Sequence, residues 1–196
     1  MKEDFRGFAQ LVRQNKDFRR IWISHMISLF GDWLSYIAVS VIAVKSGGSA
    51  LAVAMVIFVH SIPLALMTPI SGPLADRVDR KRLLIGAYLG SSLLTLGMWG
   101  AANYSSVWLL QGFLFLRVCV SGIGMTARSA AIPAIVGREH LRLANALLGL
   151  TWSVMFTLGL ALGGFASELL SPSGAILLDA MTFLLAVAVA VGLPSL

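Results

Sequence analysis

The stretch "SGPLADRVDRKRLL", residues 71–84, joins two long apolar runs and carries six charged side chains in the seven positions from Asp76 to Arg82. The chain around it is 58% hydrophobic and only 12% charged, with a mean hydropathy of +0.86. An ordinary soluble domain has about a quarter of its residues charged. Charge gathered in a short connection between apolar runs indicates a loop between two membrane-spanning helices.

Six apolar runs are long enough to cross a bilayer, since a spanning helix needs roughly 20 mostly apolar residues. None alternates strictly between polar and apolar positions, and all are too long for strands, which argues against a β-barrel. The sequence therefore predicts an all-α integral membrane protein with a polar segment at 1–20. Its six transmembrane helices are expected at about residues 21–44, 51–74, 83–102, 107–125, 144–165 and 176–193.

Thirteen of the fifteen Lys and Arg residues lie before the first run or in the connections 2–3 and 4–5. Such an excess marks cytoplasmic segments. Both termini are therefore expected in the cytoplasm of a cell that carries this multi-pass protein in its plasma or inner membrane, a bacterium in our interpretation. The net charge of +6 then reflects topology and attraction to the lipid bilayer, and no basic stripe with interleaved aromatics suggests nucleic acid as a partner.

Three helices followed by three more is the count expected of a 3+3 inverted repeat. Glycines four residues apart, at Gly86 and Gly90 and again at Gly159 and Gly163, predict close approach of helix backbones. Gly164 follows the second pair directly.

The order of residues in the 71–84 stretch resembles the loop 2–3 signature of the major facilitator superfamily, G-x-L-a-D-r-x-G-r-k-x-x-l. Asp79 stands where that signature has glycine. The resemblance implies the family's six-helix N-terminal bundle and a gating role for this loop, which latches onto a second six-helix half when the transporter faces outward. The implied gating residues are Gly72, Leu74, Asp76, Arg77, Arg80, Lys81 and Arg82.

Other stretches resemble the drug-efflux branch that includes macrolide and siderophore exporters. "FRRIWISHMISLFGDWLSYIA" at 18–38 is similar to its first helix, and "GLALGG" at 159–164 resembles the antiporter signature of helix 5. Leu160 replaces the proline of that signature and Met155 replaces its first glycine, which weakens the inference of antiport. This resemblance implies proton-coupled efflux of small amphipathic compounds by alternating access, with protons and such a substrate as partners.

Asp32, His60 and Arg117 are ionisable residues about 14–17 Å into their predicted helices, so they can share one depth near the bilayer centre. Ser28 and Ser35 lie on one stripe with Asp32, and Ser121 follows Arg117 by one turn. In the resembled fold both stripes line the central cavity. Our hypothesis is that Asp32 binds the coupling proton, because burial favours its neutral form and an approaching Arg117 its ionised form.

Two readings of these residues stay open. A fixed Asp32–Arg117 pair could instead hold two helices together, and His60 could be a packing residue rather than a proton carrier. Asp179, on the sixth helix, is expected to be structural because that helix is peripheral in the resembled fold.

No metal cluster, phosphate loop or nucleophile-base-acid set is present, so we expect neither an enzyme nor a cofactor other than a proton gradient. The resemblance covers only the N-terminal half of a family that usually has twelve spans. Three interpretations therefore remain: a fragment of a longer exporter, a half-transporter that pairs with the same or a separate chain, and a non-transporting scaffold or regulatory subunit. Uptake of another solute is a further alternative.

Overall fold

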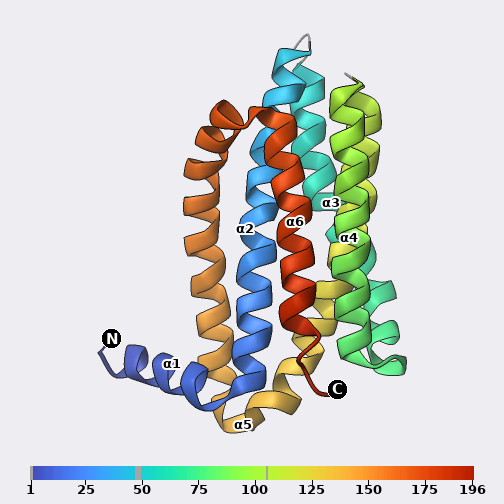
Figure 1. Cartoon of the computed structure of the whole chain (residues 1–196). Coiled ribbons are helices and arrows are strands. Elements are labelled where there is room, and N and C mark those ends of the chain that lie inside the picture. The colour runs from blue at the N-terminus through green and yellow to red at the C-terminus, as the bar shows by residue number, and fades with distance from the viewer. Residues whose placement is uncertain (1, 47–49, 105) are drawn as a thin grey trace.

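The computed structural model describes residues 2–46, 50–104 and 106–196, and within these ranges every regular element is a helix. Figure 1 shows a bundle of long helices with one short helix, α1, lying across its lower end. The elements are α1 (Lys2–Gln14), α2 (Lys16–Lys45), α3 (Ala50–Arg77), α4 (Arg80–Asn103), α5 (Val107–Leu169) and α6 (Ser171–Ala190).

Five of these helices, α2 to α6, are long and apolar enough to cross a membrane. The shortest, α6, has 20 residues and would be about 30 Å long, the thickness of the hydrocarbon core. At 63 residues, α5 would reach about 95 Å if it were straight, which no bilayer could contain.

α5 is not one straight helix, because its backbone breaks at Gly137. Gly137 has φ 72° and ψ 164°, a conformation essentially restricted to glycine, and it divides α5 into a first arm (107–136) and a second arm (138–169). Both arms belong to the bundle and meet near the lower end in Figure 1, where the second arm is orange. The sequence suggested that helix 4 ends near residue 125, but the first arm continues for three further turns because Ala127, Ala131 and Val136 stay buried.

Most helices extend past their apolar runs. α2 begins at residue 16 rather than 21, and α4 at residue 80 rather than 83, because polar residues can continue a helix beyond the hydrocarbon. Asn15 caps α2 by accepting from the backbone N–H of Phe18 at 2.9 Å. The sixth helix differs in the other direction, ending at Ala190 instead of 193.

The glycine pair on the second arm of α5 packs against α2. A Cβ at Gly163 would lie 3.0 Å from Ile37 Cβ, and one at Gly159 would overlap Trp33 Cβ. Nothing lies within 4 Å of a Cβ at Gly164. The predicted close approach of two helices is therefore present at Gly159 and Gly163, where α5 packs against α2.

The chain end after α6 folds back onto the turn between α3 and α4. The backbone N–H of Leu196 donates to Asp79 Oδ2 at 2.9 Å, and Arg80 N–H donates to the Leu196 carbonyl at 3.0 Å. Lys81 Nζ adds a bond to the Leu193 carbonyl at 2.5 Å. The C-terminus, the α3–α4 turn and α1 therefore lie at one end of the bundle (Figure 1).

Candidate functional site: a buried arginine between two carboxylates

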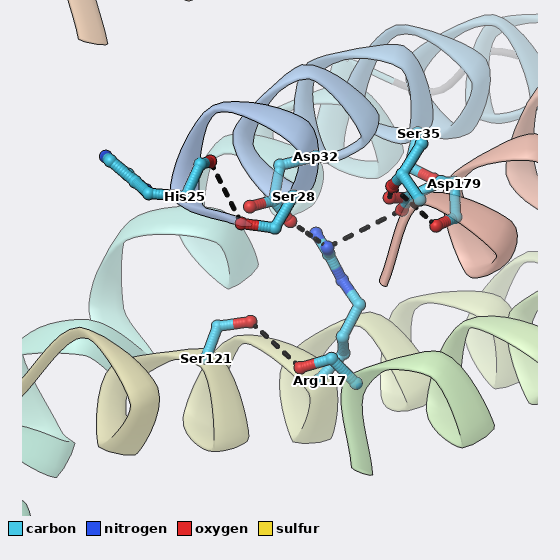
Figure 2. Close-up of polar contacts among 9 residues, drawn as sticks. His25, Ser28, Asp32, Ser35, Arg117, Ser121 and Asp179 are labelled. Atoms are coloured by element: carbon cyan, nitrogen blue, oxygen red, sulfur yellow. Dashed lines mark hydrogen bonds and ion pairs between the residues drawn. The ribbon is translucent and has the colours of Figure 1, made fainter. Parts of the chain in front are cut away.

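Arg117 is the centre of the polar site. It lies on the first arm of α5 with its side chain only 1% exposed, and its guanidinium reaches between α2 and α6 (Figure 2). Nη1 is ion-paired with Asp32 on α2 and lies 3.6 Å from Asp179 Oδ2 on α6. One cation therefore joins three helices through two acidic partners.

Asp179 is the member of this site that sequence reasoning missed as a partner of Arg117. It is fully buried, and its Oδ2 accepts a 2.5 Å hydrogen bond from Ser35. Thr182 Oγ1 donates to the backbone carbonyl of Asp179 at 2.8 Å and lies 3.3 Å from Asp179 Oδ1. The sequence signal was present, since an aspartate inside an apolar run is costly without a partner.

A glycine permits this arrangement. A Cβ at Gly31 would overlap both Asp179 Oδ1 and Thr182 Oγ1, so α6 approaches α2 closely only because position 31 has no side chain. This approach also turns Ser35 toward α6. The sequence placed Ser35 on the stripe that faces the cavity, but the structure buries it completely against Asp179.

The two carboxylates differ in access. Asp32 is 23% exposed and lines a cavity of about 150 Å³ together with Arg117, whereas Asp179 is sealed behind them. Three more predicted residues, Ser28, His60 and Ser121, line the same cavity. The structure therefore brings five of the six predicted cavity residues to one hollow.

The hydroxyls on the cavity wall already have partners. Ser28 Oγ donates to the His25 carbonyl at 3.0 Å, and Ser121 and Ser91 share a hydrogen bond of 3.2 Å. His60 differs, because its Nδ1 is buried and has no hydrogen-bond partner among the described residues. Its ring packs against aromatic neighbours, with centroid separations of 5.6 Å to Trp33 and 4.9 Å to Tyr36.

The predicted gating residues lie apart from this cavity, at the α3–α4 turn. Asp76, Arg77 and Arg82 line the outside of this turn, and within the described ranges none of them forms an ion pair. A Cβ added at Gly72 would have no heavy atom within 4 Å, and Leu74 is half-buried. Asp76, Arg77 and Arg82 are therefore exposed at this end of the bundle.

Asp79, the departure from the family signature, has its own role in this turn. It caps α4, with Oδ1 accepting from the backbone N–H of Arg82 at 2.9 Å while Oδ2 accepts from Leu196. The Arg82 N–H is the main reason that the pKa of Asp79 lies below its ordinary value. Its carboxylate therefore joins the α3–α4 turn to the segment that follows α6.

Long apolar helices around a largely buried cluster of three charges define the class of the protein, which is a multi-pass helical membrane protein. The family model described as "Transmembrane secretion effector" matches residues 7–193. The chain belongs to this family of the major facilitator superfamily.

Curated relatives agree with this assignment. The chain is 26% identical to the uncharacterized MFS-type transporter YfiS of Bacillus subtilis over 94% of its own length and 44% of that protein. Macrolide efflux protein A of Streptococcus pyogenes is 31% identical over 63% of the chain and 31% of that protein. The enterobactin exporter EntS of Salmonella paratyphi A is 28% identical over 79% and 38%.

The chain thus spans less than half the length of these curated relatives. No solved structure matches it significantly.

Proposed function

We propose that this chain is the N-terminal six-span half of a proton-coupled exporter of small amphipathic compounds in a bacterial plasma membrane. Alternating access would involve a second six-helix half, from the same or a separate chain. Family membership supports the class of activity, and two of the named relatives are an efflux protein and an exporter. The division of α5 into two apolar arms supports six spans arranged three and three.

Charge and geometry together support cytoplasmic termini. The α3–α4 turn carries four basic residues and lies at the same end as α1 and the C-terminus. Basic residues gather on the cytoplasmic side of membrane proteins. The end of the bundle drawn lowest in Figure 1 is therefore the cytoplasmic end in our proposal.

One observation carries the coupling mechanism: Arg117 has two carboxylate partners with unequal access to the cavity. Asp32 can exchange a proton with water in the cavity, whereas buried Asp179 cannot do so directly. Protonation of Asp32 would remove its attraction for Arg117, and the guanidinium would then favour Asp179, 3.6 Å away. The proton would thus exchange an α5–α2 contact for a stronger α5–α6 contact.

In our proposal the second half binds along α3 and the α3–α4 turn. α3 is sparsely buried and exposes large apolar side chains, among them Phe58, Leu66 and Ile70. Next to them the charges of Asp76 and Arg77 lack ion-pair partners within the described chain. In our proposal this turn is the cytoplasmic latch, and its partner lies on the second half.

Uptake into inside-out vesicles that contain this chain tests the proposal. Fluorescent amphipathic dyes of both charges are offered with an imposed proton gradient, to the wild type, Asp32→Asn and Asp17→Asn. Asp17 is the control, because it is an acid of the same helix that lies near its start and pairs with Arg20. We expect gradient-driven uptake that Asp32→Asn abolishes and Asp17→Asn retains.

Two outcomes would contradict the proposal. Gradient-driven uptake that survives Asp32→Asn would exclude Asp32 as the coupling residue. Absence of uptake by this chain, both alone and when co-expressed with the C-terminal half of a relative, would exclude transport by this bundle.

A further inference from the structure

A second arginine lines the cavity, and the coupling mechanism does not use it. Arg128 follows Arg117 by eleven residues on the first arm of α5, about 17 Å or three turns, so both lie on one face of the helix. In the sequence, the count of basic residues places Arg128 in the cytoplasmic connection 4–5, whereas its spacing continues the polar stripe of Arg117 and Ser121 on the fourth helix. Because the first arm continues to residue 136, Arg128 instead lies on the cavity wall.

Arg128 and Arg117 differ in their partners. Arg117 is held by two carboxylates, whereas within the described chain Arg128 forms no ion pair. The neighbours of Arg128 are His25 on α2 and Tyr88 on α4, and both also line the cavity. Tyr88 offers Arg128 a hydroxyl within hydrogen-bond reach rather than a carboxylate, and the same hydroxyl donates to Ser24 Oγ at 3.4 Å.

Asp32 lines the same cavity and attracts Arg128, but its carboxylate is ion-paired with Arg117, so Arg128 has no carboxylate partner of its own among the described residues. An arginine in a confined cavity is a costly arrangement unless another group supplies negative charge. A guanidinium offers five N–H donors in a planar fork that matches carboxylates, sulfonates and phosphates. The guanidinium of Arg128, at the cytoplasmic end of the cavity, is therefore suited to bind an anionic group.

Apolar surface surrounds this cation. Trp33 and Trp152 line the cavity with ring centroids 6.1 Å apart, and Leu64, Met125 and Phe183 complete much of the wall. A ligand that fits the hollow would place an apolar or aromatic body against these side chains and an acidic group at Arg128.

We propose that Arg128, with His25 and Tyr88 beside it, forms an anion subsite of the cavity, and that the substrates are acidic amphipathic compounds. This inference rests on the proposed transport function and specifies its substrate class. A lipophilic cation would meet at this end an arginine that forms no ion pair with any described residue, and at Asp32 it would have to displace Arg117. An anionic lipid headgroup shares the chemistry of a soluble anion, so the test separates the two sources.

The test measures binding with two probes that share a fluorophore. Dansyl-aminohexanoate is an anion and dansylcadaverine a cation, and Trp33 and Trp152 serve as energy-transfer donors in the cavity. The full chain in phosphatidylcholine nanodiscs is titrated as wild type, Arg128→Gln, Arg128→Lys and Arg138→Gln. Arg138→Gln is the matched control, because it removes an arginine from the same part of the chain that is exposed and outside the cavity.

We expect saturable binding of the anion that Arg128→Gln weakens about ten- to hundredfold, the range for a lost hydrogen bond to a charged group. Arg128→Lys should recover part of the affinity, and Arg138→Gln should match the wild type. Repeating the titration with phosphatidylglycerol added identifies the source. If the lipid occupies the subsite, it lowers the apparent affinity of the wild type but not that of Arg128→Gln.

Two results would overturn the subsite. Saturable binding of the cation without binding of the anion would exclude it while leaving a transport cavity in place. Anion binding that is equal in the wild type and Arg128→Gln would exclude it as well. A chain that binds neither probe would contradict both the subsite and the proposed transport function.

Discussion

Removing the guanidinium of Arg117 is expected to be one of the most destabilising single changes in the bundle. Arg117→Gln leaves the carboxylates of Asp32 and Asp179 facing one another without a cation, and Asp179 is fully buried. Breaking a buried ion pair by removing one partner costs about 3–5 kcal/mol. Protonation of one carboxyl relieves part of that cost, so we expect a loss of about 3 kcal/mol in the free energy of unfolding at neutral pH.

A double-mutant cycle shows whether this loss arises from the proposed contact. Arg117→Gln/Asp179→Asn removes one charge of each sign, so the double variant should recover about 1–2 kcal/mol relative to the sum of the two single changes. The free energies are measured by unfolding in mixed micelles with increasing dodecyl sulfate, followed by helical circular dichroism. Arg142→Gln is the control, because Arg142 is exposed and forms no ion pair within the described ranges.

Additive losses in the free energy of unfolding would contradict the proposed contact between Arg117 and Asp179. Losses of the two single variants that sum to that of the double variant within about 0.5 kcal/mol would mean that Arg117 and Asp179 do not interact.

Three further predictions concern the backbone and the cytoplasmic turn, each measured by the same unfolding assay. Gly159→Ala should cost about 1–3 kcal/mol by separating α5 from α2, whereas Gly164→Ala, with open space around it, should cost little. Gly137→Ala should also cost about 1–3 kcal/mol because of its positive φ, whereas Gly149→Ala, inside the helix and unobstructed, should be neutral or stabilising. Asp79→Ala should cost about 1 kcal/mol and Asp79→Asn less, since asparagine also caps helices. Because the pKa of Asp79 is lowered in the folded chain, its ionised form contributes stability above its unfolded pKa, and this contribution should be lost as the pH falls through the folded value. These assignments would be contradicted by equal losses in Gly159→Ala and Gly164→Ala, or by equal effects of Gly137→Ala and Gly149→Ala. An Asp79→Ala variant as stable as the wild type would contradict the assignment of Asp79 as a helix cap.

Helical class and the depth of the polar residues could be predicted from the sequence because both depend on position along a single helix. Length and hydropathy identify spans, and a rise of 1.5 Å per residue places Asp32 and Arg117 at one depth. Their contact in the structure agrees with that estimate.

Asp179 could not be assigned in the same way, because its partners depend on which helices are neighbours and how closely they approach. The approach of α6 to α2 depends on the missing side chain of Gly31, and a single glycine among many gives no sign of that contact. Ser35 was misplaced for the same reason, since its direction is determined by Asp179 on α6.

The sequence gives two conflicting indications of where Arg128 lies. Its charge and its place after an apolar run are typical of a cytoplasmic loop, whereas its spacing from Arg117 and Ser121 is typical of a continuing helix face. The structure follows the spacing, because buried residues beyond 125 keep the first arm of α5 packed against its neighbours.

Infrared difference spectroscopy of the chain in nanodiscs tests proton binding at Asp32 most directly. A shift from alkaline to acidic pH should produce protonated-carboxyl bands from several of the nine acidic residues, including one component that Asp32→Asn removes and Asp17→Asn retains. Binding of the proton at Asp32, with Arg117 free to favour Asp179, predicts this result. A spectrum that is the same in Asp32→Asn and in the wild type would show that Asp32 binds no proton over this pH range and would contradict the coupling mechanism.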